Sequence, residues 1–568
     1  MPQISLGSYL ISRLMEVGVR HVFGVPGDYN LPLLQQLESA GAPTYIGCCN
    51  ELNAAYAADG NARLAGISAV VTTYGVGELS ALNGAAGAYA EHVPLIFITG
   101  APPLSLMRQR ALLHHTLADG DFDNTFSCFR HFTVAQSRLT PMNACAEIDR
   151  LLVTCWQEKR PVYLQLPCEL PMLHVAAPRE PLALFNASVN PAHQDAALAA
   201  MRKALHNAHA PAMLLDAAVD RFNLSTVVLG FAENRQIPFA MLSSAKSILP
   251  ETHPLCLGIY AGQFSQENTR NAIERSDCLL CFDTRLTDLA TGLFSHALPA
   301  GKLIQIGATY ITVGAQTFDG LDIRRLLESL SPASLPLPPP QVAPNISTGN
   351  AILGADAQLG CNRFWQRAES FICAGDVIVA EAGTSSMMLN RISLPDDVQV
   401  VSQAIWSSIG FALPAVLGSA LAQPDRRHLL FIGDGAFQMT AQELSTILSH
   451  DIKPIIFLIN NDGYTIERCI LGANARFNDV NPWRYAELIG AMHKTASGSC
   501  FTVKTERELE HALLKAASAP HTTFIEVVLE RMDVPDKILK LGQQLASLNY
   551  GAAHVESDAT PTDAALLQ

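Results

Sequence analysis

Short apolar runs alternate with helical stretches through the first third of the chain. Residues 21–25 (HVFGV), 67–74 (ISAVVTTY) and 95–99 (LIFIT) have the apolar, β-branched composition of buried strands. Residues 51–65 place alanines and Leu52 at helical spacing, and residues 1–20 show a similar helical periodicity. Buried strands that alternate with helices are typical of a parallel sheet covered on both faces. We therefore expect an α/β fold at this end of the chain.

The same alternation returns twice along the chain. Further strands are expected at residues 212–215, 279–283 and 302–306, and then at 377–380, 428–432, 454–460 and 523–528. Residues 331–350 between these blocks are rich in proline and poor in periodic apolar positions, which indicates an extended linker. We predict three doubly wound α/β domains with largely parallel sheets, at residues 1–185, 186–345 and 346–568. The linker ends the second domain, and a frayed tail after Gly551 ends the third. The first and third domains are expected to contain similar sheets.

Composition narrows the class of protein. The chain has 568 residues, 49% hydrophobic and 16% charged, which fits large buried cores and excludes a disordered chain. Its net charge is −14, and nucleic-acid binding needs a clustered basic surface instead. The 13 cysteines are scattered and odd in number, so no disulfide framework is expected. The N-terminus lacks a basic stretch followed by an apolar run, so we expect no signal peptide and a cytoplasmic protein.

One uncharged segment is long enough to cross a bilayer. It lies between Asp397 and Asp425, but it contains several glutamines and serines as well as Gly410 and Pro414. These residues are too polar for a lipid-facing helix. We therefore expect a buried helix in an α/β core, and no membrane.

Polar turns follow two neighbouring strands of the last third. The strand at residues 428–432 ends in Gly433-Asp434-Gly435, and the strand at 454–460 ends in Asn461-Asp462-Gly463. Between them we predict a helix at 440–449, opened by a capping box of Thr440 and Glu443. In such a βαβ unit both turns lie at the carboxyl edge of the sheet, so Asp434 and Asn461 can converge. Their oxygen ligands suit Mg²⁺ or Ca²⁺, and the glycines allow a close approach to phosphate.

This spacing resembles the thiamine-diphosphate-binding motif, and four further blocks resemble one family. They are residues 24–30 (GVPGDYN), residues 50–60 (NELNAAYAADG), His114-His115-Thr116 and residues 463–467 (GYTIE). The chain is similar to the thiamine-diphosphate-dependent 2-oxo acid decarboxylases from its first helix to about Pro535. Within that family it looks closest to the indolepyruvate, phenylpyruvate and branched-chain enzymes, with pyruvate decarboxylase nearby. The resemblance implies a pyrimidine-binding domain, a middle domain and a diphosphate-binding domain.

The resemblance also implies a role for individual residues. Glu51 would bond the aminopyrimidine ring of the cofactor and help to form its ylide, and Asp28, His114, His115 and Glu467 would handle protons. Magnesium would be held by Asp434, Asn461 and the Gly463 carbonyl. The cofactor would also contact Thr384, the Ser407 carbonyl, Ile409 as an apolar wedge, Gly433, Gly435, Ala436 and Ile466. Glu51 would come from one subunit and the metal motif from another, which implies at least a dimer and a tetramer as a dimer of dimers.

The residues that would line the substrate pocket favour a bulky 2-oxo acid. By resemblance they are Leu289, Ser386, Met387, Ile466, Ile470 and Ile538, the last on a terminal helix that begins at Asp536 and covers the site. Pyruvate-specific members carry bulky aromatic residues at the positions of Leu289 and Ser386, so smaller residues there should admit aromatic or branched side chains. Two positions depart from the aromatic and branched-chain members, because Ala382 replaces a glutamine and Met387 a phenylalanine. The expected reaction is decarboxylation of bulky 2-oxo acids to aldehyde and CO₂, with pyruvate as the alternative substrate.

Other interpretations rest on weaker patterns. Gly75-Val-Gly77 follows a predicted strand as a dinucleotide-binding turn would, but Ser80 occupies the third glycine position. A thiamine-dependent carboligase would share the metal motif, whereas His114-His115 and Glu467 favour a decarboxylase. Cys278 and Cys281 have the spacing of a metal or redox pair, but no second pair accompanies them and core cysteines are the better interpretation.

Overall fold

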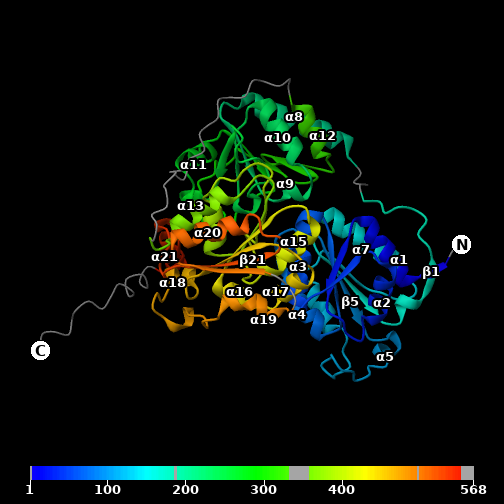
Figure 1. The fold of residues 1–568 in the computed structure, drawn as a ribbon. Coiled ribbons are helices and arrows are strands. Elements are labelled where there is room, and N and C mark those ends of the chain that lie inside the picture. The colour runs from blue at the N-terminus through cyan, green and yellow to red at the C-terminus, as the bar shows by residue number, and fades with distance from the viewer. Residues whose placement is uncertain (1–2, 185–188, 332–356, 495–497, 552–568) are drawn as a thin grey trace, which may run out of the picture.

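Three large sheets organise the chain. The computed structural model describes residues 3–184, 189–331, 357–494 and 498–551, and Figure 1 shows it as a ribbon. The first sheet has the order β3 (Thr44–Gly47), β2 (His21–Gly24), β4 (Ser68–Thr72), β5 (Leu95–Ala101), β7 (Val162–Pro167), β6 (Ala135–Arg138). All its neighbouring strands are parallel. The helices of this part are α1 (Leu6–Val17), α2 (Leu31–Ala40), α3 (Glu51–Ala65), α4 (Val76–Ala90), α5 (Leu104–Arg108), α6 (Asn124–Phe129) and α7 (Ala144–Glu158).

The last sheet repeats the first. Its order is β17 (Gln399–Val401), β16 (Val377–Ala380), β18 (His428–Gly433), β19 (Ile455–Asn460), β21 (Thr522–Val528), β20 (Gly498–Val503), again all parallel. The expectation that the two ends of the chain contain similar sheets is confirmed. Its helices are α13 (Cys361–Phe371), α14 (Thr384–Leu389), α15 (Ala412–Ala422), α16 (Asp434–Thr440), α17 (Glu443–Ser449), α18 (Thr465–Ile470), α19 (Leu488–Met492), α20 (Glu506–Ala516) and α21 (Asp536–Tyr550).

The middle sheet is mixed. Its order is β11 (Cys256–Ile259), β10 (Phe239–Met241), β9 (Pro211–Leu215), β12 (Cys278–Phe282), β13 (Leu303–Ile306), β14 (Tyr310–Val313), β15 (Gln316–Asp319). The pairs β13–β14 and β14–β15 are antiparallel, and the other pairs are parallel. The helices here are α8 (Pro191–Asn207), α9 (Ala218–Arg221), α10 (Ser225–Arg235), α11 (Glu267–Glu274) and α12 (Ile323–Leu330). A two-stranded pair of β1 (Gln3–Ser5) and β8 (His174–Ala176) completes the described strands. The predicted α/β fold with largely parallel sheets is confirmed.

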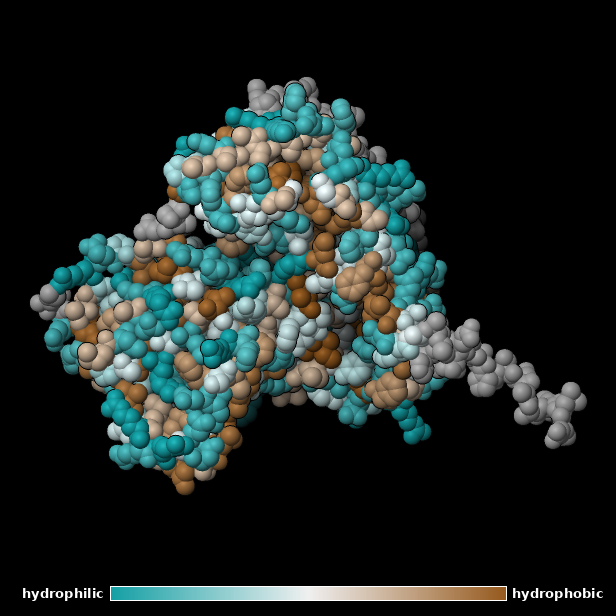
Figure 2. Space-filling view, turned by 180° about the vertical axis from the view of Figure 1, so that it is seen from behind, coloured by the Kyte–Doolittle hydropathy of each residue, from teal (hydrophilic) through white to brown (hydrophobic). Residues whose placement is uncertain are grey.

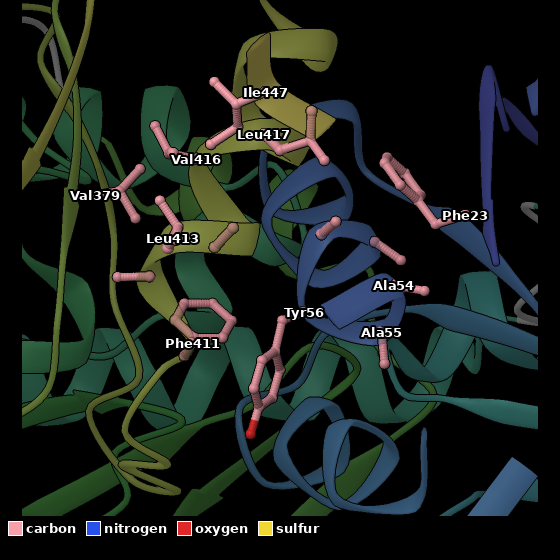
Figure 3. Close-up of a cluster of buried hydrophobic side chains, with 14 of the residues drawn as sticks. Phe23, Ala54, Ala55, Tyr56, Val379, Phe411, Leu413, Val416, Leu417 and Ile447 are labelled. Carbon is pink, nitrogen blue, oxygen red and sulfur yellow. The ribbon is translucent and has the colours of Figure 1, made fainter. Parts of the chain in front are cut away.

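The first and last sheets share one hydrophobic core. Helix α3 crosses α15 closely, because a Cβ atom at Gly60 would lie 2.2 Å from the Ala415 carbonyl oxygen and one at Gly418 only 1.7 Å from that of Ala57. Figure 3 shows side chains of both helices meeting in this core. Glycines thus let two backbones touch. Helix α3 begins at the predicted site residue Glu51, and α15 follows the loop that carries Ser407 and Ile409.

Two expectations need correction or qualification, and one is supported. The helix predicted at 440–449 is wrong at its start: Thr440 ends α16, which begins at Asp434, and Glu443 begins α17. The uncharged segment contains a buried helix only in its second half, α15, after β17 and a loop. Cys278 and Cys281 are buried in different hydrophobic clusters, which supports the core interpretation. The linker at 332–350 and the tail after Gly551 lie outside the described residues.

None of the described helices combines the length and the apolar character needed to cross a bilayer.

Candidate functional site

Asp28, His114 and His115 meet at the carboxyl edge of the first sheet. Asp28 follows β2, and the histidines lie in the loop that follows β5 and α5. His114 Nε2 is 2.8 Å from one oxygen of the Asp28 carboxylate, and His115 Nε2 is 3.9 Å from the other. The Tyr29 ring stacks on His114 with 5.2 Å between ring centroids. Two imidazoles and a carboxylate therefore stand together, and their side chains are at least one-third exposed, so they can exchange protons with a bound molecule.

Glu51 begins helix α3 beside the same part of the sheet. Asn50 caps the helix, since its side-chain oxygen accepts a hydrogen bond of 2.8 Å from the Asn53 N–H. Glu51 Oε1 lies against the turn after β4, where it would be 2.9 Å from a Cβ atom at Gly77. The His115 carbonyl lies against the same turn, at Gly75. We call Asp28, Glu51, His114 and His115 the N-terminal group.

Asp434, Asn461 and Gly463 form a second group at the carboxyl edge of the last sheet. Asp434 is 1% exposed, and its two oxygens accept hydrogen bonds from the N–H groups of Gly435 (2.8 Å) and Gly463 (2.9 Å). Burial raises the pKa of Asp434 to about 6. In the described part of the chain no cation forms an ion pair with this carboxylate. A buried carboxylate, a buried amide oxygen at Asn461 and backbone carbonyls fit a magnesium ion.

Residues 403–411, the wedge loop, carry Ser407 and Ile409. Ser407 has φ +53° and Gly410 φ +91°, so the chain is left-handed on both sides of Ile409. Gly410 also has no room for a side chain, since a Cβ atom would lie 2.7 Å from that of Met439. Ile409 keeps 37% of its surface exposed. An exposed isoleucine on a tightly determined loop is available to contact a cofactor.

Four predicted pocket residues line one cavity of about 330 Å³. They are Leu289, Ser386, Met387 and Ile538, and the lining also includes Gly383, Ser407 and residues of the middle sheet's loops. Ile466 and Ile470 are not among the lining residues, although Ile466 lies 3.7 Å from where a Cβ atom at Gly383 would be. Helix α21 packs on α18, which carries Ile466, Glu467 and Ile470. The middle-sheet part of this cavity was not anticipated from the sequence, because its residues come from separate loops without a shared motif.

Neither group lines the cavity. Its walls include none of Asp28, Glu51, His114 and His115, and none of Asp434, Asn461 and Gly463. Glu467 is exposed on α18, and Figure 1 shows α18 and α5 on opposite sides of the molecule. The loop after α5, which carries His114 and His115, is therefore separated from Glu467 in the single chain.

Several buried polar residues hold these segments through contacts that the sequence did not indicate. Glu443 accepts hydrogen bonds from the Cys49 N–H (3.2 Å) and the Asn53 amide (2.8 Å), so it fixes the start of α3 instead of capping its own helix. The Tyr56 hydroxyl donates to Ser408 of the wedge loop (2.7 Å). Glu381 accepts from two backbone N–H groups at the end of that loop, and burial raises its pKa to about 7. An acidic residue directly after the apolar strand β16 is the one signal that could have indicated Glu381.

Comparison with known proteins decides the family. Residues 4–123 match the N-terminal TPP binding domain of the thiamine pyrophosphate enzymes, residues 198–325 their central domain, and residues 381–527 their C-terminal TPP binding domain. An alpha-keto-acid decarboxylase of Mycobacterium ulcerans is 39% identical over 97% of this chain and 98% of its own. A relative of the same name in Mycobacterium bovis BCG is 39% identical over 96% of this chain and 98% of its own. One in Mycobacterium avium is 37% identical over 95% of this chain and 96% of its own.

The chain belongs to the thiamine-diphosphate-dependent 2-oxo acid decarboxylases. Thiamine pyrophosphate is another name for thiamine diphosphate, so the cofactor predicted from the sequence is confirmed. As a member of this family the chain is a carboxy-lyase that acts on a 2-oxo acid. The decarboxylase is thus favoured over the carboligase and the dinucleotide oxidoreductase.

Proposed function

We propose that this decarboxylase acts on bulky 2-oxo acids, aromatic ones such as indolepyruvate or phenylpyruvate or branched-chain ones, with magnesium as the metal. The observation that carries the proposal is the cavity of about 330 Å³ beside Ser386 and Leu289. Its size lies within the range of sites for small organic ligands, well above the needs of a single methyl group. Each buried methylene of a larger substrate would contribute ~0.8 kcal/mol.

The second group would hold the cofactor. Bound thiamine diphosphate supplies a carbon nucleophile and an electron sink for the loss of CO₂. Asp434, the Asn461 side chain and the Gly463 carbonyl would hold magnesium, and Thr384, Gly433, Gly435 and Ala436 would adjoin the diphosphate. Ile409 and the Ser407 carbonyl would orient the rest of the cofactor, with Ile466 alongside.

The N-terminal group would handle protons. Glu51 would exchange a proton with the aminopyrimidine ring, for which a half-buried carboxyl at a helix start is suitably placed. Asp28, His114 and His115 would deliver a proton before the aldehyde leaves, together with Glu467. The hydrogen-bond distance between Asp28 and His114 supports a joint role for this pair in proton transfer.

A complete site would need two chains. The histidine loop after α5 and Glu467 on α18 lie on opposite sides of one chain, so a partner could supply the missing half. Exposed apolar side chains lie near the N-terminal group at Val76, Leu79, Leu112 and Leu117 (46–73% exposed). Figure 2 shows apolar patches on the lobe that carries α5, at the lower left of that view. Apolar surface of this kind is typical of contacts between proteins. Assembly into a tetramer and a cytoplasmic location stay predictions.

The test is aldehyde release from a panel of substrates. The protein is stripped of cofactor and metal, resupplied with thiamine diphosphate and Mg²⁺, and assayed with indolepyruvate, phenylpyruvate, 4-methyl-2-oxopentanoate and pyruvate. We expect aldehyde only after both additions, and faster with the larger substrates. Aldehyde from pyruvate at a kcat/KM above all the others would refute the pocket argument, and activity without metal would refute the magnesium site.

A further inference from the structure

Glu381 connects two loops of the cofactor site. It follows β16 and precedes residues 382–384, and it is 1% exposed. One carboxylate oxygen accepts a hydrogen bond from its neighbour Ala382 (3.0 Å). The other accepts from the N–H groups of Gly410 (3.2 Å) and Ala412 (3.1 Å), directly after Ile409. One side chain therefore links the loop that leads to Thr384 with the loop that carries Ile409.

The wedge loop needs such a link. Left-handed conformations at non-glycine residues persist only where the surroundings enforce them, and Ser407 has φ +53°. Both polar backbone groups of Gly410 are fixed, since the Thr440 hydroxyl donates to its carbonyl (2.7 Å) and Glu381 accepts from its N–H. Helix α16, which ends at Thr440, begins at the predicted metal ligand Asp434. The loop is thus held between the metal motif and Glu381.

A buried carboxylate is usually paired with a cation, but within the described part of the chain that of Glu381 is not. In the described residues no Lys, Arg or His pairs with it, and its hydrogen-bond donors are backbone N–H groups. A buried carboxylate without a cation is costly, and burial accordingly raises its pKa to about 7. A carboxylate is suited to this place because both of its oxygens are acceptors, whereas an amide offers only one.

We propose that Glu381 is a positioning residue for thiamine diphosphate, which fixes the distance between the Ile409 wedge and the Thr384 loop by accepting hydrogen bonds from both. The inference rests on the proposed roles of Ile409 and Thr384. Glu381 does not contact the cofactor in this account. It acts through the backbone of Gly410 and Ala412.

The test compares Glu381→Gln with Asp376→Asn. Asp376 is a matched control because it directly precedes β16 as Glu381 directly follows it, and it is also buried (3% exposed), where it pairs with Arg427. Both variants change a carboxylate to an amide. Three properties are measured for each full-length protein with saturating Mg²⁺: the melting temperature, the Kd for thiamine diphosphate by calorimetry, and the exchange of the C2 proton of bound cofactor with deuterium.

Glu381→Gln is expected to raise the cofactor Kd about tenfold and to slow C2 exchange by a similar factor, since one of the two loops then faces an amide N–H₂. Asp376→Asn is expected to lower the melting temperature and to leave both other properties within about twofold of wild type. Unchanged Kd and exchange in Glu381→Gln would overturn the inference. Equal effects of both variants would also overturn it, because the cause would then be general loss of stability.

Two further variants keep the test decisive. Should Glu381→Gln not fold, Glu381→Asp retains the charge but is one methylene shorter, so it cannot bridge both loops and should also slow C2 exchange. Wild-type exchange in Glu381→Asp would contradict the inference. Ile409→Ala separates the two proposals: normal cofactor binding and exchange in that variant would refute the wedge assignment, whereas a defect there and none in Glu381→Gln would refute only the role of Glu381.

Discussion

Two inactive variants should restore activity when they share a dimer. Glu51→Gln removes the proposed proton-exchanging carboxyl, and Asp434→Asn removes the charge of the proposed metal site. In this structure Glu51 lies against Gly77. In the proposed site built from two chains, Glu51 comes from one chain and Asp434 from the other. In a mixed dimer, one site carries both changes and the second site carries neither.

The expected magnitude follows from this arrangement. Loss of a group that transfers a proton typically lowers the rate by about 10²–10⁴-fold, so Glu51→Gln alone should retain about 1% or less. Asp434→Asn is expected to be as inactive, because it removes the charged ligand of the proposed metal. A mixed dimer keeps one intact site out of two and should retain about half of the wild-type rate. Recovery should therefore exceed the background by about fiftyfold or more.

The assay uses co-expression with two different affinity tags and isolation of the mixed dimers by both tags. Aldehyde release is measured with phenylpyruvate, and the melting temperature confirms that each variant is folded. A mixed dimer of Glu51→Gln and Glu51→Ala is the matched control, because both of its sites lack the carboxyl and neither can recover. Activity of the Glu51→Gln and Asp434→Asn mixture at the level of that control would refute a site assembled from two chains.

Three further outcomes are expected from single changes. Ser386→Trp should fill the cavity and lower kcat/KM for phenylpyruvate by about 100-fold, because about 100 Å² of apolar contact is lost. Steady-state rates with pyruvate should fall much less. Equal losses for both substrates would contradict the assignment of this cavity as the substrate pocket. Gly542→Ala should push α21 away from α18, because its Cβ atom would lie 2.7 Å from the Cys469 backbone. The change should lower the unfolding free energy by about 1–3 kcal/mol and raise KM. Gly490→Ala, whose Cβ atom would meet nothing within 4 Å, is the control in denaturant titrations, and a similar loss there would remove the argument. Burial raises the pKa of Glu381 to about 7, so the ionised carboxyl destabilises the apoprotein. The difference in unfolding free energy, wild type minus Glu381→Gln, should therefore fall as the pH rises from 5 to 8. A constant or rising difference would contradict this pKa.

The strands of the first and last sheets could be predicted from the sequence because they are buried on both faces. An apolar run such as residues 377–380 then needs no alternating pattern to be recognised. The start of α3 at Glu51 was also predictable, since Asn50 caps the helix locally. Asp434 and the turn at Asn461 could be expected to converge because parallel strands bring successive turns to one edge, and Asp434 accepts a hydrogen bond from Gly463 of that turn.

Interactions between distant segments could not be predicted. Thr440 and Glu443 have the spacing of a capping box, but their partners are Gly410 and the start of α3, which the local sequence does not reveal. The cavity walls from the middle sheet depend on how three sheets pack. The role of Glu381 depends on a backbone turn at Gly410, 29 residues further along the chain.

Direct competition between two substrates tests the central claim most simply. The enzyme, loaded with thiamine diphosphate and Mg²⁺, is given phenylpyruvate and pyruvate at equal concentration, and the initial rates of the two aldehydes are measured in the same vessel. Their ratio equals the ratio of the two kcat/KM values. We predict that phenylacetaldehyde forms faster than acetaldehyde by about tenfold or more. An excess of acetaldehyde would contradict a site built for bulky 2-oxo acids.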